Sequence, residues 1–208
     1  MTPNSLPIAS RPKAEQSKAQ TRKVLLKRRE IAHQTEPLGP LPAMCDWLSA
    51  RLRRDYILAT YNPTRTERDP SPLHAAMAAD LAFPRVMGPN QPLAFFLARS
   101  EADFEIGSFG VLEPKKNLPQ VFPDLILVPL VGFDHAGYRL GYGGGFYDRT
   151  LAQIRAKKTV LAVGFAYDGQ RSSQPLNFEP TDLALDAIIT PTCCYEFQSP
   201  TAKVTPWS

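Results

Sequence analysis

The chain is poor in the residues that build disulfide frameworks, metal clusters and membrane spans. Its three cysteines, Cys45 and the adjacent pair Cys193 and Cys194, have no C-x-x-C spacing, so neither a zinc site nor a set of disulfides is indicated. No stretch of eighteen apolar residues exists, so we expect no membrane helix. The first seven residues lack the apolar segment of a secretory signal. We therefore expect a cytoplasmic protein in a reducing compartment.

The positive charge of the chain is concentrated near its start. The 208 residues carry a formal net charge of +4, and residues 1–30 contain eight Lys/Arg against two Glu, which gives them +6. The rest of the chain is therefore at −2. A nucleic acid could meet only a local basic patch, and basic residues on a helix are more often a solvated face. We do not expect a nucleic-acid partner.

Apolar segments and helical patterns alternate along the chain. We expect strands at 56–61, 93–98, 124–131, 160–165 and 186–190, and helices at 14–33, 41–52, 71–81 and 147–157. The apolar runs are continuous, as in strands that are covered on both faces. This pattern predicts one three-layer α/β/α domain. We assign it to residues 14–197, with a mobile tail at 1–13 and a polar tail at 198–208.

The most informative segment is residues 139–149, RLGYGGGFYDR, which follow an apolar strand and lead into a helical pattern. Four glycines within five positions permit backbone conformations that side chains forbid, and they let an anion approach the main-chain N–H groups. Arginines at both ends and the carboxylate of Asp148 suit a nucleoside triphosphate with its magnesium ion. The segment is no Rossmann fingerprint, which would need Gly in place of Phe146, and no Walker loop. The glycines alone are also compatible with a tight turn between a strand and a helix.

Residues 133–148, FDHAGYRLGYGGGFYD, resemble the signature of the 5-formyltetrahydrofolate cyclo-ligase family. In that family a run Phe-Asp-x-x-Gly-x-Arg-Leu-Gly-x-Gly-x-Gly-Tyr-Tyr-Asp closes over ATP. The chain departs from this run at Phe146, where the family usually has Tyr. The resemblance extends over about residues 18–192. It implies a NagB/RpiA/CoA-transferase-like fold, in which ligands collect at the carboxyl ends of the strands.

Two basic residues near the start and the glycine segment are expected to bind the nucleotide. Lys18 and Arg22 are four residues apart, so on a helix they share a face that can hold a polyphosphate, although such pairs are more often solvated. The family has a Lys-x-x-x-Arg pattern here, usually with Leu in place of Thr21, and a further basic residue at the position of Arg28. The resemblance implies ATP binding by Lys18, Arg22, Arg139, Gly141, Tyr142, Gly143, Gly144, Gly145, Phe146 and Tyr147.

A polar loop after the first strand is expected to bind the folate. Glu67 and Asp69 fit the family's Glu-x-Asp/Glu pattern, and a carboxylate can accept two N–H groups of a pterin edge. Without the resemblance, these residues would be an ordinary polar turn. Phe109 can form an aromatic wall, although an aromatic beside glycine is as often part of the core. The substrate-binding residues that the resemblance implies are Asn62, Glu67, Phe109, Tyr142, Gly144 and Phe146.

Two carboxylates are expected to bind Mg²⁺. The resembled family places a metal carboxylate at the positions of Asp148 and Asp186, and Mg²⁺ usually takes one or two carboxylates completed by phosphate oxygens. The alternatives are a charge at a helix N-terminus for Asp148 and a strand-edge residue for Asp186. Arg139 and Tyr147 are the expected catalytic residues. Arg139 would neutralise charge on the transferred phosphate, and Tyr147 would flank the substrate.

The resemblance implies an ATP- and Mg²⁺-dependent enzyme. It would convert 5-formyltetrahydrofolate, with or without a polyglutamate tail, to 5,10-methenyltetrahydrofolate, ADP and phosphate, and we expect it to act as a monomer. Two alternatives stay open: a sugar-phosphate or CoA-ester enzyme on the same fold, and a non-catalytic relative that binds folate, or RNA through residues 11–29. Retention of the glycines, Arg139, Tyr147, Asp148 and Asp186 favours catalysis.

Overall fold

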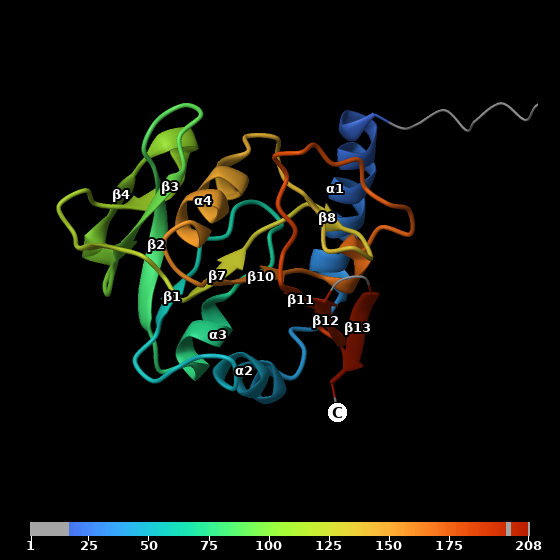
Figure 1. The fold of residues 1–208 in the computed structure, drawn as a ribbon, viewed down its shortest axis with the longest axis horizontal. Coiled ribbons are helices and arrows are strands. Elements are labelled where there is room, and N and C mark those ends of the chain that lie inside the picture. The colour runs from blue at the N-terminus through green and yellow to red at the C-terminus, as the bar shows by residue number, and fades with distance from the viewer. Residues whose placement is uncertain (1–16, 199–200, 208) are drawn as a thin grey trace, which may run out of the picture.

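The computed structural model describes residues 17–198 and 201–207, and they form a mixed α/β fold around a large mixed sheet (Figure 1). The helices are α1 (Lys18–Thr35), α2 (Leu41–Ser49), α3 (Ser71–Ala76) and α4 (Phe146–Arg155). The strands are β1 (Ile57–Ala59), β2 (Asp80–Val86), β3 (Leu93–Leu97), β4 (Phe104–Ile106), β5 (Leu112–Pro114), β6 (Gln120–Val121), β7 (Leu125–Val128), β8 (Gly132–Phe133), β9 (Arg139–Leu140), β10 (Leu161–Phe165), β11 (Ala187–Ile189), β12 (Cys193–Gln198) and β13 (Thr201–Pro206). The expected tail at 1–13 lies outside the described residues.

Nine strands form the central sheet in the order β13-β12-β11-β10-β7-β1-β2-β3-β6. The five strands from β11 to β2 are parallel, whereas β12, β13, β3 and β6 each pair antiparallel with the neighbouring strand on the inner side. Parallel strands present their carboxyl ends at one edge of a sheet, where ligands usually bind in such folds. The loops that follow β1 and β7 therefore emerge side by side at that edge.

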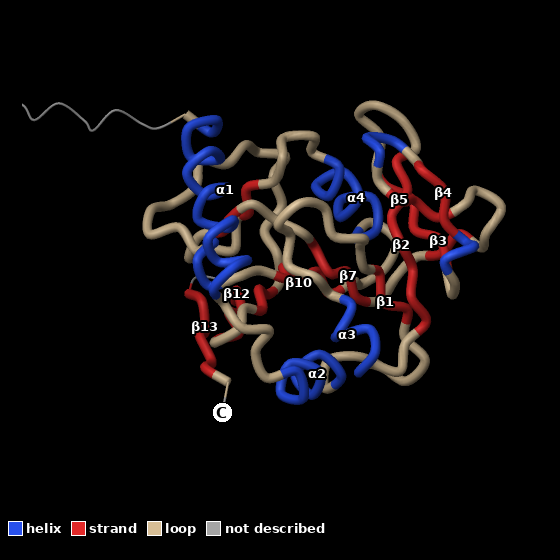
Figure 2. The backbone as a smooth tube through the Cα atoms, turned by 180° about the vertical axis from the view of Figure 1, so that it is seen from behind, coloured by secondary structure: helices blue, strands red, loops and turns tan. Residues whose placement is uncertain are grey.

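Strand β7 shows why the sheet is covered on both sides. All four of its side chains are buried, because successive residues of a strand point to opposite faces. Ile126 and Val128 pack in a cluster with Leu151 and Ile154 of α4, whereas Leu125 and Leu127 pack in a cluster with residues of α2 and α3. In the ribbon and tube views, α4 and α1 lie on one side of the sheet and α2 and α3 on the other (Figures 1 and 2).

Helix α1 begins at a capping box. The Ser17 hydroxyl accepts a hydrogen bond from the backbone N–H of Gln20, and the Gln20 side chain accepts one from the N–H of Ser17. These bonds satisfy N–H groups that the first turn of a helix leaves without partners. The cap fixes where the helix starts, and it places Lys18 in the first turn at the rim of the molecule.

Two expectations about chain segments are wrong. The helix expected at 71–81 ends at Ala76, and Asp80–Val86 form β2 between β1 and β3. The polar tail expected at 198–208 is wrong for residues 201–206, which form β13 and pair with β12. The sequence of β2 contains Asp80, Pro84 and Arg85, and that of β13 is largely polar, so local hydrophobicity does not indicate either strand. Among the described residues, no helix has the length and apolar character that a membrane span requires.

Candidate functional site

A cleft of about 940 Å³ opens at the carboxyl edge of the parallel strands. Its walls come from the start of α1, the loop after β1, the hairpin of β4 and β5, the glycine segment and residues 177–183. Of the fifteen positions that the sequence marks as candidates, the cleft is lined by Lys18, Arg22, Asn62, Glu67, Phe109, Arg139, Gly141, Tyr142, Gly143, Gly144, Gly145, Phe146, Tyr147 and Asp148. Segments that are far apart in sequence thus meet at one site.

The glycine segment forms the turn from β9 into α4. Gly143 and Gly145 have φ values of +100° and +61°, in the left-handed region that side chains rarely adopt. Gly145 is also the N-cap of α4, so the first N–H groups of this helix open toward the cleft side of the turn. The Arg149 side chain folds back and donates a hydrogen bond to the carbonyl of Gly144 over 2.7 Å. The segment can therefore present backbone N–H groups to an anion.

The Arg139 guanidinium holds the two ends of this turn in place. It donates to Asp148 Oδ1 over 2.7 Å and to the carbonyl of Leu183 over 2.6 Å, and its side chain is only 6% exposed. Asp148 Oδ1 also accepts a bond from the N–H of Leu183 over 3.1 Å. Burial lowers the pKa of Arg139, and the neighbouring Asp148 opposes that shift. Arg139, Asp148 and Leu183 thus tie β9, α4 and the 177–183 segment together.

Lys18 and Arg22 both reach the cleft from one face of α1. Arg22 Nε donates to the carbonyl of Gly141 over 2.8 Å. Lys18 Nζ lies 2.9 Å from both Glu179 Oε1 and Asp182 Oδ2. Partial burial lowers the pKa of Lys18, but the hydrogen bonds and charges of Asp182 and Glu179 outweigh it and leave the pKa above its usual value. Lys18 is therefore held at the rim by two carboxylates that the sequence did not single out.

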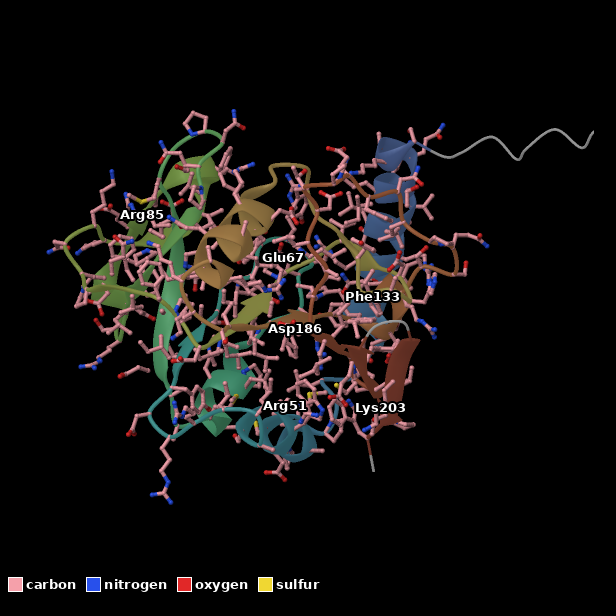
Figure 3. The ribbon with its side chains drawn as sticks, viewed as in Figure 1. Arg51, Glu67, Arg85, Phe133, Asp186 and Lys203 are labelled. Carbon is pink, nitrogen blue, oxygen red and sulfur yellow. The ribbon has the colours of Figure 1, made fainter. Side chains whose placement is uncertain are left out.

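Glu67 faces the cleft from the loop after β1, and in the view of Figure 3 it lies between α4 and α1. Its Oε2 accepts hydrogen bonds from the backbone N–H and the hydroxyl of Thr64, over 2.8 and 3.0 Å. Its Oε1 lies 4.0 Å from Arg29 Nη1. Burial raises the pKa of Glu67, and the bonds from Thr64 and the charges of Arg29 and Arg65 oppose that shift.

Aromatic side chains line the cleft on the side of the β4–β5 hairpin. Phe109 is 82% exposed at the tip of the hairpin, and its φ of +59° is unusual for a residue other than glycine. Its ring lies 6.3 Å from that of Phe146 in a T-shaped arrangement. Phe109 is thus no core residue, and an exposed aromatic in a strained conformation at a cleft is typical of a ligand contact. Asn62 donates to the carbonyl of Leu112 over 3.1 Å, which ties its loop to the hairpin.

Tyr147 lies deeper, in the first turn of α4. Burial and the nearby charge of Glu67 raise the pKa of its hydroxyl, while Arg139 acts in the opposite direction. The hydroxyl is therefore a neutral donor across the physiological pH range. It forms no hydrogen bond with the part of the chain that the structure describes, so it is available to a ligand.

Asp186 is the one candidate that the structure does not bring to the cleft. Its Oδ2 accepts hydrogen bonds from Arg155 over 3.0 Å and from the backbone N–H of Ala162 over 2.7 Å. Asp186 precedes β11, which runs parallel to β10, so it lies at the edge of the sheet opposite to the carboxyl ends. Its partner Arg155 is seven residues beyond Asp148, about 10 Å along α4. The expectation that Asp186 binds the metal together with Asp148 is therefore corrected.

The sequence did not single out Arg29, the neighbour of Arg28 on α1. Arg28 is exposed, whereas Arg29 is 1% exposed and points into the protein beside the cleft. The available signal was spacing: Arg29 is seven residues after Arg22, so two helical turns place both on the same face.

Comparison with known proteins gives consistent matches. The family model described as the 5-formyltetrahydrofolate cyclo-ligase family matches residues 14–191. A 5-formyltetrahydrofolate cyclo-ligase of Escherichia coli K12 is 38% identical over 109 residues, which are 50% of this chain and 59% of the relative, so the match spans less than two thirds of that protein. One of Mycolicibacterium smegmatis is 29% identical over 197 residues, covering 84% of this chain and 94% of the relative. The solution structure of an Aquifex aeolicus 5,10-methenyltetrahydrofolate synthetase matches with a TM-score of 0.66 and 27% identity, covering 89% of this chain and 95% of that one.

Proposed function

Because the chain belongs to the 5-formyltetrahydrofolate cyclo-ligase family, we propose that it converts 5-formyltetrahydrofolate and ATP to 5,10-methenyltetrahydrofolate, ADP and phosphate. The observation that carries this proposal is the meeting of two kinds of wall in one cleft. A basic, glycine-rich wall suited to phosphates faces a wall with the buried carboxylate of Glu67 and the exposed ring of Phe109. A volume of about 940 Å³ has room for both a nucleotide and a folate.

The reaction needs alignment of two substrates and no covalent nucleophile. The formyl oxygen attacks the γ-phosphate, N10 then attacks the activated formyl carbon, and phosphate leaves as the ring closes. The work of the protein is therefore to position the groups and to stabilise the developing charge. Arg22, Lys18 and the N–H groups at the start of α4 would hold the phosphates, and Arg139, fixed by its bonds to Asp148 and Leu183, would stand beside the transferred group.

The folate would lie against the other wall. Glu67 offers Oε1 to N–H groups of the pterin, since its Oε2 is already engaged by Thr64. Phe109 and Phe146 would contact its ring system, and the neutral Tyr147 hydroxyl would donate a hydrogen bond near the reacting centre. Asn62, Tyr142 and Gly144 also line the cleft and complete the proposed contacts to the folate.

The residues present fit a magnesium ion that is bound mainly through the nucleotide. Asp148 Oδ2 forms no hydrogen bond with the described residues, and its carboxylate lines the cleft at the start of α4. The described residues contain no cluster of three or more side chains suited to a metal. One carboxylate completed by phosphate oxygens is a common arrangement for Mg²⁺, which would neutralise charge on the phosphates. Asp148 would then be the protein's ligand.

Several finer points belong to the same proposal. The sheet with helices on either side supports the NagB/RpiA/CoA-transferase-like assignment, with residues 14–197 and also the strand at 201–206 as one domain. We propose a monomer in the cytoplasm, and the free thiols of all three cysteines agree with a reducing compartment. Polyglutamylated folates are included among the substrates. No separate observation favours a non-catalytic folate- or RNA-binding relative.

The decisive experiment uses the full chain with 5-formyltetrahydrofolate, ATP and Mg²⁺. Formation of the conjugated methenyl product is followed by its absorbance, and release of ADP is measured in parallel. Equal amounts of both products, formed only when both substrates are present, are expected. ADP release without the folate, or no methenyl product at any Mg²⁺ concentration, would contradict the proposal.

A further inference from the structure

Arg29 is a buried cation that lies behind the wall of the cleft. It lies on α1, on the same face as Lys18 and Arg22, and its side chain is 1% exposed. A buried guanidinium is costly unless its N–H groups have partners. Arg29 meets this requirement with acceptors from three segments of the chain that are remote from α1, and each of these segments belongs to the cleft or supports it.

The hydrogen bonds of Arg29 connect the two walls. Its Nη2 donates to the Tyr142 hydroxyl over 2.5 Å, and its Cζ lies 5.4 Å from the centre of the Tyr142 ring. Its Nε donates to the Thr66 hydroxyl over 3.2 Å, directly before Glu67 in the chain. Its Nη1 donates to the carbonyl of Leu130 over 3.2 Å, in the segment that follows β7. One side chain thus joins the glycine segment to the Glu67 loop.

Arg29 also places a positive charge beside Glu67 from a different element of the fold, helix α1. Its Nη1 lies 4.0 Å from Glu67 Oε1, and both side chains are buried. The other charged or titratable groups that act on Glu67 are Arg65 of its own loop, and the hydroxyls of Tyr61 and Tyr147, which burial keeps neutral. Arg29 therefore favours the ionised form of the carboxylate without occupying it through a close hydrogen bond. Oε1 stays open to a ligand.

We propose that Arg29 is a positioning residue, which holds the folate-binding carboxylate of Glu67 ionised and in register with the nucleotide-binding Tyr142 across the cleft. The inference rests on the proposed function, because it assigns Glu67 to the folate and Tyr142 to the nucleotide side. It divides the role of Arg29 into two separable parts. The positive charge acts on Glu67, and the forked geometry of the guanidinium acts on Tyr142.

The test compares three variants with a matched control. Arg29→Met removes the charge and the hydrogen bonds, Arg29→Lys keeps the charge and loses the fork, and Tyr142→Phe removes only the acceptor hydroxyl. Lys23→Met removes one positive charge from an exposed position of the same helix. For each protein, kcat/KM for the folate is measured against pH, KM for ATP is measured at neutral pH, and folding is checked by thermal melting.

The two parts predict different readouts. In Arg29→Met, loss of the positive charge raises the pKa of Glu67, so the acid limb of the folate kcat/KM profile moves to higher pH; in Arg29→Lys and Tyr142→Phe it stays near the wild-type position. Hydrogen bonds to a charged group are worth enough that both Arg29 variants and Tyr142→Phe should raise KM for ATP, on the order of tenfold. Arg29→Lys and Tyr142→Phe remove the same hydrogen bond, so the double variant should raise KM for ATP no further than either single variant does.

Each outcome decides the inference. The inference is overturned if Arg29→Met folds, the acid limb of its pH profile does not move and its KM for ATP is unchanged. It is also overturned if kcat falls at every pH without either of these shifts, because Arg29 would then serve only the packing of the protein. If Arg29→Met does not fold, Arg29→Lys and Tyr142→Phe decide: additive effects on KM overturn the proposed link. Absence of methenyl product in the wild type would instead refute the proposed function. In that case nucleotide-dependent thermal stabilisation of the same variants would still test the link to Tyr142.

Discussion

Asp148→Asn should impair the protein in two measurably different ways. Asn keeps the shape of the side chain but removes the negative charge, which faces Arg139 at 2.7 Å on one oxygen and the cleft on the other. The Arg139 side chain is 6% exposed, and no other carboxylate of the described residues is bonded to it. The substitution therefore weakens a buried charge-assisted bond as well as the proposed metal ligand.

The stability cost follows from the bond that is weakened. A hydrogen bond between charged groups contributes about 1.5–3 kcal/mol. For a domain of this size, each kcal/mol lowers the melting temperature by about 2–4 °C, so a fall of about 3–12 °C is expected. The loss in catalysis should be larger, because a metal ion supplies several kcal/mol of charge stabilisation to phosphoryl transfer. That corresponds to a fall in kcat on the order of a thousandfold.

The assay pairs thermal melting with methenyl formation over a range of Mg²⁺ concentrations, and Asp186→Asn is the matched control. Asp186 also pairs with an arginine on α4, but that pair is more exposed, with 30% and 42% of its two side chains accessible. Its loss should cost no more than about 1 kcal/mol and leave the dependence on Mg²⁺ unchanged. If Asp148→Asn turns over normally at limiting Mg²⁺, Asp148 serves only the fold. If Asp186→Asn raises the Mg²⁺ requirement, our placement of the metal is wrong.

Three further predictions concern the walls of the cleft. Gly145→Val should abolish the ATP-dependent rise in melting temperature, because a branched side chain is strained at φ +61°. The control Gly141→Ala adds a Cβ that has no atom within 4 Å, so this variant should fold normally. If ATP raises the melting temperature equally in the wild type and in Gly145→Val, the nucleotide binds elsewhere. Glu179→Gln removes one exposed partner of Lys18, so KM for ATP should fall by up to about fivefold, and a higher KM would instead make Glu179 part of the binding site. Glu67→Gln should lose folate turnover. Burial raises the pKa of Glu67 and so penalises its charged form in the folded protein, so the variant should become more stable than the wild type as pH rises above the usual range of a glutamate. Melting curves in which the variant shows no such gain over the wild type between acid and neutral pH would refute this.

Much of the fold follows from local pattern, and the exceptions have a common cause. The apolar run at 124–131 contains β7, which ends at Val128, directly before the proline that was expected to bend or end the strand. The first two residues of β2 were expected to end a helix and the rest of this strand was not predicted, because its side chains alternate less clearly and its partners β1 and β3 lie on either side only in the folded sheet. The polar β13 pairs through its backbone with β12, and backbone pairing leaves little trace in side-chain composition.

The sequence by itself determined the chemistry of the glycine segment and, through it, the family. Positive φ values, main-chain N–H groups free of side-chain obstruction and a carboxylate in the next helical turn are local requirements, so a contiguous run of residues can encode them. The tertiary structure alone decided which charges meet. Whether Asp186 or Asp148 faces the cleft depends on the edge of the sheet at which each carboxylate emerges. Likewise, the burial of Arg29 between Glu67 and Tyr142 arises from three segments that become neighbours only on folding, since no local rule states which cation on a helix face will be enclosed.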